Sequence, residues 1–413
     1  MLLKKIRIED KGKVIIDTDL SKTDIKDAMN TTLILGENGV GKSFCLKIIT
    51  DIFIYLEKAL KQSRKPKYEY ESFHVEYILD NNDYSVTRVS SREIKATKNG
   101  KEIDYKSINL PARLLAISFM VNDKFVFSKN MEGTYKYLGV RSSSNCTYTS
   151  SITRKLTENL IISICNKKYE EVLRILRMIG FDEKIEFEYS DAGNKKTCFA
   201  NDYDRVNDIF KGFPYRRVSA YFWKRGKKVT FDNCSSGEKH ILFAFVSLLR
   251  EIENESLILI DEPEISLHPE WQIQYISKLQ AIFGYYSKCH FILASHSHYF
   301  VSDLPKESSS IVIFRHSDET SPQSELLPFD TYAWSAENII YNVFGLRTTR
   351  NYYFETDISM LLKAITKYTG DRTEKKEIGD LIKKLKHYSL GDQDPLNDVI
   401  NEAEELIGCS VDG

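Results

Sequence analysis

The segment 36–43, GENGVGKS, constrains the fold of this chain more than any other feature. It follows the apolar run 31–35 and precedes a second apolar stretch, 44–49, so it lies where a strand gives way to a helix. Its glycines let the backbone curl until successive N–H groups point at one anion, and the first turn of the helix adds the positive end of its dipole. The sequence therefore predicts a phosphate-binding loop between a buried strand and a helix.

Two side chains of this loop carry specific chemistry. The Lys42 ammonium would reach the β- and γ-phosphates of a nucleotide, and the Ser43 hydroxyl would ligate Mg²⁺. The residues expected at the nucleotide are Gly36, Glu37, Asn38, Gly39, Val40, Gly41, Lys42, Ser43 and Phe44. The alternative is a glycine-rich turn that binds no nucleotide, and the flanking strand and helix disfavour it.

A strand that ends in carboxylates is the second motif. The apolar residues 257–260 precede Asp261 and Glu262, and the carboxyl end of a buried strand is where α/β sheets hold their ligands. Asp261 would hold Mg²⁺ through water, and Glu262 would act as the general base on the attacking water. By itself the same pattern also fits a strand that merely ends in solvated acids.

Two shorter motifs flank this strand in the sequence. The first is a turn before the apolar helix 241–249, where an anion would meet Ser235, Ser236, Gly237 and Glu238. The second is His296, which follows the apolar run 291–294 and would sense the γ-phosphate. Alone, the turn is an ordinary helix cap and such a histidine is more often structural. Their order relative to the first two motifs is what makes them informative.

Composition restricts the environment of the chain. Its 58 lysine and arginine residues balance 59 aspartate and glutamate residues, so net charge draws it neither to nucleic acid nor to a membrane. The 7 cysteines show no C-x-x-C spacing, which argues against a disulfide framework and a zinc site. The start MLLKKIRIED has no apolar signal segment, and the longest apolar run is far shorter than a membrane span. We therefore expect a cytoplasmic protein.

The order of strand-like and helical patterns predicts four regions. Residues 1–150 would form an N-terminal lobe with the phosphate loop and an antiparallel block. Residues 151–230 would be a helical insertion, because apolar residues recur there at helical spacing. Residues 231–330 would form a C-terminal lobe, with continuous apolar runs typical of buried parallel strands. Residues 331–413 would be mostly helical, with a possible role in docking a partner.

The motif order resembles that of ABC-type ATPases, in the soluble branch related to the SMC, RecF and OLD proteins. By that resemblance, segment 36–43 matches the Walker A loop and 235–238 the signature turn. Asp261 and Glu262 match the Walker B pair, and His296 matches the switch histidine.

That resemblance implies the fold, the ligands and the assembly. The fold would be α/β: an ABC-type ATPase head with a mixed parallel core sheet, an antiparallel β subdomain, a helical insertion and a helical C-terminal tail. The ligands would be ATP and Mg²⁺. Two subunits would pair head to tail, so that the loop of one faces the signature turn of the other across ATP.

The chain departs from the family at one position. The glutamine that usually follows the antiparallel block and ligates Mg²⁺ is missing, and the segment 118–125 (SFMVNDKF) occupies its place. Asn122 or Asp123 would substitute, although a plain loop fits equally well. The segment 264–269 (EISLHP) looks like the D-loop region, with the His-Pro pair typical of the OLD-like branch.

A narrower resemblance links the chain to the ATPase subunits of Septu and retron-associated Septu anti-phage systems. It rests on the short segments 135–141 (YKYLGVR), 335–340 (SAENII) and 342–345 (NVFG). It implies an ATPase that regulates a separate effector, with an HNH-type nuclease as partner. Contact with DNA, or with retron RNA and DNA, would come through that complex.

Two other functions stay open. An OLD-like ATPase-nuclease would need a Toprim metal site, and the late motif Asp392-Gln393-Asp394 lies in a predicted loop. A RecF- or SMC-like DNA-repair ATPase would need a DNA surface, for which the basic residues are Lys58, Lys61, Arg64, Lys65 and Lys67. A membrane transport motor is disfavoured, because the LSGGQ signature and the coupling glutamine are absent.

Overall fold

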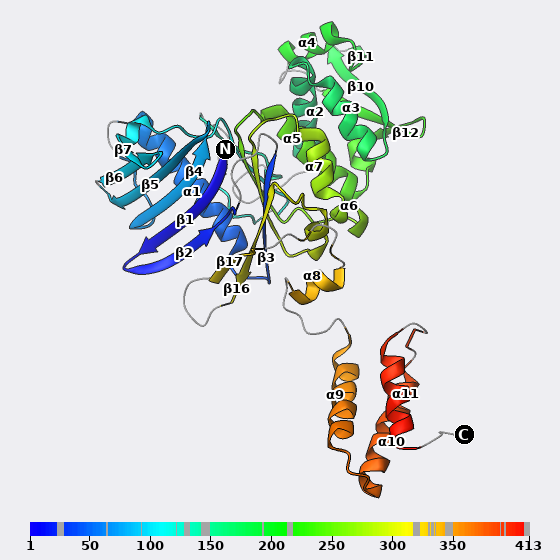
Figure 1. The fold of residues 1–413 in the computed structure, drawn as a ribbon. Helices are drawn as coiled ribbons and strands as arrows, with labels where there is room; N and C mark the ends of the chain where they lie inside the picture. Colours follow the sequence, from blue (N-terminus) through cyan, green and yellow to red (C-terminus); the bar gives the residue numbers. More distant parts are fainter. Residues whose placement is uncertain are drawn as a thin grey trace. The chain divides into compact units, whose positions relative to one another are not determined.

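The computed structural model divides the chain into two compact units, Met1–Phe344 and Gly345–Gly413 (Figure 1). It describes residues 1–22, 29–62, 65–91, 93–120, 122–127, 133–141, 149–191, 194–212, 218–316, 323–328, 331, 334, 336–342, 350–388, 390–391 and 394–408. The residues of the motifs named above that lie outside this description are Arg64, Val121, Ser335, Asp392, Gln393 and 343–345.

A seven-stranded sheet forms the centre of the larger unit, in the order β17-β16-β3-β15-β14-β8-β9. Its strands are β3 (Asn30–Gly36), β8 (Leu114–Ser118), β9 (Tyr135–Tyr137), β14 (Leu257–Asp261), β15 (His290–Ser295), β16 (Ser309–Arg315) and β17 (Gln323–Leu326). All neighbours pair in parallel except β16 with β17. The buried parallel strands expected from the apolar runs are confirmed, since every residue of β3, β14 and β15 is buried.

A six-stranded antiparallel sheet, in the order β2-β1-β4-β5-β6-β7, makes the antiparallel subdomain. Its strands are β1 (Leu2–Asp10), β2 (Lys13–Asp19), β4 (Ser72–Leu79), β5 (Asn82–Ser90), β6 (Glu93–Lys98) and β7 (Lys101–Ile103). The hairpin between β6 and β7 turns at Asn99 and Gly100, whose φ angles are 51° and 75°, as expected for a tight turn with an Asn-Gly sequence.

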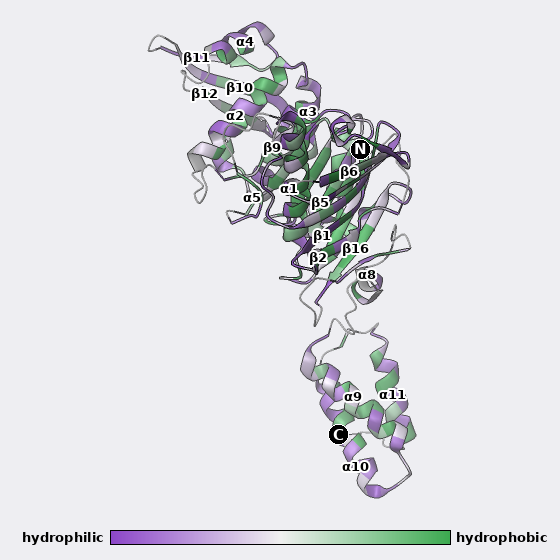
Figure 2. Ribbon diagram, turned by 90° about the vertical axis from the view of Figure 1, so that its left-hand side faces the viewer, coloured by the Kyte–Doolittle hydropathy of each residue, from purple (hydrophilic) through white to green (hydrophobic). Residues whose placement is uncertain are grey.

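Helices cover both faces of the central sheet. Alternate residues of β14 show the division: Leu257 and Leu259 belong to one core with α1 (Lys42–Lys61) and the antiparallel sheet. Ile258 and Ile260 belong to a second core with α5 (Ser236–Glu251) and α7 (Tyr275–Phe283). Figure 2 shows hydrophobic colour concentrated on the central strands and on the helices beside them. Burial on both faces explains why these strands contain continuous apolar runs instead of an alternating pattern.

The insertion between the lobes, expected as helical over 151–230, contains a four-stranded sheet as well as helices. Its helices are α2 (Thr149–Cys165), α3 (Tyr169–Met178) and α4 (Tyr203–Gly212). Its strands are β10 (Asp182–Asp191), β11 (Asn194–Phe199), β12 (Val218–Lys224) and β13 (Lys227–Thr230), in the order β11-β10-β12-β13. The signal was present in the sequence, because Ile185 and Phe187 alternate with Glu186 and Glu188 along β10.

The smaller unit is a three-helix unit with a core of its own. Its helices are α9 (Tyr352–Lys367), α10 (Arg372–His387) and α11 (Leu396–Leu406). Asn351 and Asp371 cap α9 and α10 by accepting hydrogen bonds from backbone N–H groups. The helical C-terminal tail expected from the resemblance is therefore confirmed. Figure 2 shows both hydropathy colours on each of these helices. Two further short helices, α6 (Pro269–Ile273) and α8 (Ala336–Asn342), belong to the larger unit. Across the residues described above, no helix is both long and apolar enough to cross a membrane.

Candidate nucleotide-binding site

The candidate site lies where three parallel strands end. Asp261, the last residue of β14, pairs with Ala294 of β15, and Ser295 pairs with Leu35 of β3. Because parallel strands present their carboxyl ends at one edge of a sheet, the loop after β3, the carboxylates after β14 and His296 after β15 come from one edge. Three of the four sequence motifs thus meet through strand pairing alone.

The phosphate loop has the backbone conformation that its glycines allow. Gly39 and Gly41 have φ angles of 84° and 101°, and Gly41 caps α1. Gly36 has a φ of 152°, and a Cβ atom at this position would lie 2.3 Å from the carbonyl oxygen of Phe314 in β16. A side chain at Gly36 would therefore push the loop away from the sheet.

The Lys42 ammonium is held inside this loop. Its Nζ donates hydrogen bonds of 2.8 Å to the carbonyl oxygens of Gly36 and Glu37, and the residue is buried. Burial lowers the pKa of Lys42, and the nearby carboxylates of Glu262, Glu264 and Asp261 counteract this in part. A phosphate group entering the loop would supply the negative charge that a buried ammonium needs.

Ser43 and Asp261 meet at the start of α1. The Ser43 hydroxyl donates a hydrogen bond of 2.9 Å to Asp261 Oδ1. Burial raises the pKa of Asp261 to about 7, and negative charge on Glu262, Asp123 and Glu264 adds to this effect. A hydroxyl and a carboxylate in a region of excess negative potential suit Mg²⁺, which prefers oxygen ligands. Ser43 and Asp261 are therefore the residues that would hold the metal.

Glu262 occupies a strained position directly after the strand. Its φ of 49° is unusual for a residue with a side chain, and its N–H donates a hydrogen bond of 2.9 Å to the Ala294 carbonyl. Asp261 is buried but Glu262 is half-buried. The turn thus gives adjacent carboxylates different surroundings, one inside the protein and one with access to water.

His296 is held by the carboxylate of Glu264, which belongs to the segment 264–269 that resembles the D-loop region. Glu264 Oε1 lies 3.0 Å from His296 Nδ1 and also accepts a 2.8 Å hydrogen bond from the His296 N–H. The hydrogen bond to Glu264 raises the pKa of His296, and the Glu264 side chain is only 6% exposed. With Nδ1 engaged, the other ring nitrogen, Nε2, is the one left to meet a phosphate. Glu264 is a positioning residue that only the structure reveals.

The signature turn is stabilised by hydrogen bonds of its own, and part of it is exposed. Ser235 accepts a hydrogen bond from the Glu238 N–H, and Glu238 accepts one from the Ser235 N–H, which completes a capping box at the start of α5. Lys224 forms an ion pair with Glu238. Ser235 and Ser236 are exposed, whereas Gly237 is buried, and a Cβ atom on Gly237 would lie 3.1 Å from the Ser266 carbonyl.

Asp123, one candidate for the missing glutamine, has other partners. Its Oδ1 accepts hydrogen bonds from Arg141 (2.7 Å) and from the Phe125 N–H (2.9 Å). Its Oδ2 accepts one of 2.6 Å from the Tyr137 hydroxyl. A carboxylate with both oxygens engaged is a poor first choice as a metal ligand, and this favours a structural role. The other candidate, Asn122, is exposed.

Comparisons with known proteins agree with this type of site. Residues 177–302 match the family described as "AAA domain, putative AbiEii toxin, Type IV TA system". This range contains the signature turn, the Walker B pair and His296. The chain resembles an SMC head domain from Thermotoga maritima with a TM-score of 0.40 and 13% identity, over 80% of this chain and 100% of that one.

Two relatives resemble this chain over most of its length. It is 22% identical over 364 residues to the Septu protein PtuA of Bacillus mycoides, across 86% of this chain and 46% of that protein. It is 23% identical over 363 residues to "Retron Vc95 probable ATPase" of Vibrio cholerae, across 68% of this chain and 69% of that protein. The chain thus spans about half the length of PtuA. The expected resemblance to Septu and retron ATPases is confirmed. The roles of single residues stay predictions.

The raised pKa of Asp261 gives a prediction about stability. Because folding raises this pKa from 3.8 to about 7, the folded chain takes up a proton between these values, and stability falls as pH rises through that window. Asp261→Asn removes the buried charge, so without Mg²⁺ it should stabilise the protein at about pH 8 by on the order of 1–3 kcal/mol, and by much less at about pH 5.

Urea unfolding followed by tryptophan fluorescence would measure this effect, because Trp223, Trp271 and Trp334 all lie in the larger unit. Asp83→Asn, at an exposed surface aspartate, is the control and should show no such gain. An Asp261→Asn gain that is the same at both pH values would contradict the interpretation.

Proposed function

We propose that this protein binds Mg²⁺-ATP in the loop 36–43 and hydrolyses it, and that the ATP cycle regulates a separate nuclease in anti-phage defence. The observation that carries the proposal is the contact between Ser43 and Asp261, 2.9 Å long, which joins the phosphate loop to the carboxylates at the end of β14. The similarity to Septu and retron proteins supports the defence role.

Each residue has a distinct task in the proposed hydrolysis. Loop N–H groups and Lys42 bind the phosphates, and Lys42 would exchange its bonds to the loop carbonyls for bonds to phosphate oxygens. Mg²⁺, when bound by Ser43 and Asp261, would neutralise part of the phosphate charge. Glu262, with access to water, would take a proton from the attacking water, and His296 would contact the γ-phosphate through Nε2. Glu264 keeps the imidazole in place.

The complete site would require two subunits, paired head to tail. Ser235 and Ser236 are exposed at the start of α5, where the helix dipole favours an anion. We infer that this turn of one subunit meets the γ-phosphate held by the other, so that closing the dimer completes both sites.

The effector is proposed to be an HNH-type nuclease, in contact with this chain through the three-helix unit. Tyr353 and Met360 lie seven positions apart, on one face of α9, and they are 73% and 51% exposed. Exposed apolar side chains on a helix face are a common partner surface. DNA, or retron RNA and DNA, would be reached through this complex.

Little in the described structure favours the alternatives. An OLD-like nuclease would need Asp394 at a metal site, but this residue forms an ion pair with Arg350 at 2.8 Å. A RecF-like clamp would need the lysines to contact DNA. Lys61 pairs with Glu57 at 2.7 Å, and the Lys65 ammonium lies 5.0 Å from the centre of the Tyr105 ring. These contacts are those of ordinary surface residues.

Replacement of Glu262 should separate binding from hydrolysis. Glu262→Gln keeps the size of the side chain but cannot take up a proton at neutral pH, so ATP should still bind while hydrolysis slows by roughly 10²–10⁴. A fluorescent ATP analogue measures binding, and phosphate release measures hydrolysis. Lys42→Ala is the non-binding control, and Glu270→Gln, at an exposed neighbouring acid, should be as active as the wild type. A fully active Glu262→Gln enzyme would remove Glu262 from the mechanism.

Mixed subunits should reveal whether Ser235 acts across the dimer. In a dimer of one Lys42→Ala and one Ser235→Arg subunit, the trans arrangement puts both lesions in one site and leaves the other intact. Since roughly half of randomly mixed dimers are of this kind, about a quarter of wild-type ATPase activity should return. Each variant alone should be inactive. If mixed dimers are shown to assemble and stay inactive, Ser235 does not act in trans.

The partner surface can be tested without truncating the chain. Tyr353→Ser combined with Met360→Ser should release a co-expressed HNH nuclease in a pull-down and leave ATP hydrolysis unchanged. Tyr285→Ser, at another tyrosine that is 73% exposed but lies in the larger unit, is the matched control. The chain alone should not cleave DNA, whereas the complex should do so in a nucleotide-dependent way. DNA cleavage by the purified chain that Asp392→Ala abolishes would favour the OLD-like alternative.

A further inference from the structure

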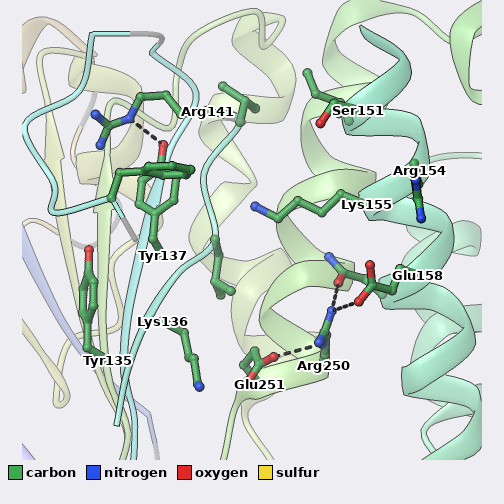
Figure 3. A pocket seen from close by; sticks show the side chains of 15 residues that line it. Tyr135, Lys136, Tyr137, Arg141, Ser151, Arg154, Lys155, Glu158, Arg250 and Glu251 are labelled. Carbon is green, nitrogen blue, oxygen red and sulfur yellow. Dashed lines mark hydrogen bonds and ion pairs between the residues drawn. The ribbon is translucent and has the colours of Figure 1, made fainter. Parts of the chain in front are cut away.

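A second polar pocket lies apart from the residues assigned to ATP. Its volume is about 450 Å³, and it lies between the segment 135–141, helix α2 and the last turn of α5 (Figure 3). Neither the sequence motifs nor the comparisons assign it a function.

Positive side chains predominate in its lining. The cationic residues are Lys136, Arg141, Arg154, Lys155 and Arg250, and the acidic residues are Glu158 and Glu251. Both acids lie close to Arg250, whose Nη1 is 3.3 Å from Glu158 and whose Nε is 2.9 Å from Glu251. Both acidic side chains of the lining are thus paired with Arg250.

The charge of Lys155 is compensated less by neighbouring carboxylates than that of Arg141 or Arg250. Figure 3 shows its side chain extending from α2 toward the segment that carries Tyr137. Its Nζ donates a 2.9 Å hydrogen bond to the Gly139 carbonyl and lies 5.7 Å from the ring centres of Tyr137 and Phe243. Within the described parts of the chain it forms no ion pair with a carboxylate. Burial, and then the charge of Arg250, lower the pKa of Lys155 to about 8, and the charge of Glu158 counteracts this only in part. An ammonium that is mostly charged at neutral pH and forms no ion pair of its own favours an anionic ligand.

Aromatic rings border the same space. The partly exposed rings of Phe127 and Tyr137 line the pocket, with ring centres 5.5 Å apart. Rings of this kind stack on nucleobases, and cations from different elements suit a phosphate group that has several oxygens. An inorganic anion or an acidic peptide would use the charges without the rings.

We propose that this pocket binds a phosphate ester that carries a base, either a free nucleotide or the end of a single-stranded nucleic acid, with Lys155 as its main anchor. The binding site is separate from the ATP loop and does not rest on the proposed hydrolysis. Arg141 lines the pocket and also pairs with Asp123 at 2.7 Å, so part of its charge is already compensated.

The experiment uses the full chain with Lys42→Ala, so that the phosphate loop does not compete. The probe is a short, fluorescently labelled oligothymidylate with a terminal phosphate, and its binding is followed by fluorescence anisotropy. Lys155→Met, which keeps the aliphatic stem, should weaken binding at least about tenfold. Lys155→Arg keeps the charge and should retain most of the affinity. Thermal melting of each variant checks the fold.

Lys168→Met is the matched control. Lys168 is also a partly buried lysine that donates to a backbone carbonyl, that of Leu249 at 2.6 Å, and lies 5.4 Å from the centre of the Tyr286 ring. Lys168 lies outside this pocket, so its replacement by methionine should leave probe binding unchanged. Competition with unlabelled AMP and with inorganic phosphate identifies the source of the phosphate. Displacement by AMP indicates a nucleotide site, and resistance to AMP indicates a strand end.

Three results would overturn the proposal. The first is that neither the oligonucleotide nor AMP binds. The second is that Lys155→Met binds the probe as tightly as the parent protein. The third is that Lys155→Met and Lys168→Met weaken binding equally, since that would reflect general charge and not this pocket.

Discussion

The parallel pairing of β3, β15 and β14 is the constraint on which the rest of the molecule depends. It fixes the register of Leu35 against Ser295 and of Ala294 against Asp261, and it thereby brings together three chain segments that are far apart in sequence. Since a slip of one residue would turn each strand's apolar side chains toward the other face, the two cores on either side of the sheet hold this register. The geometry of the site therefore depends on core packing that takes no part in the chemistry.

The cost of this arrangement is concentrated at the end of β14. Asp261, Glu262 and Glu264 lie within four residues of one another, and Asp261 and Glu264 are buried. Like charges that share a buried region oppose folding, and the turn at Glu262 adds backbone strain. A divalent cation of the kind proposed for Ser43 and Asp261 would offset this negative charge. Functional sites commonly lower the stability of the folded protein in this way.

Local patterns were the part of this molecule that the sequence could predict. The loop, the strand ends and the buried parallel strands depend on residues that are adjacent in the chain, and the structure contains all of them. The contact of Arg141 with Asp123 and that of His296 with Glu264 join residues 18 and 32 positions apart, and no periodic pattern records such a pairing. The sheet in the insertion is a different case. Its alternation was visible in β10, but the stronger helical period of the preceding segment concealed it.

The capping box at Ser235 shows how one side chain can serve both the fold and a ligand. Within the cap, the hydroxyl oxygen only accepts a hydrogen bond, from the Glu238 N–H, so its proton is not consumed by the helix. Helix α5 therefore needs no second subunit in order to begin at this residue. The serine is already immobilised when a phosphate arrives, and little conformational entropy remains to be lost at that point. Assembly would then select an existing arrangement of this turn instead of having to create one.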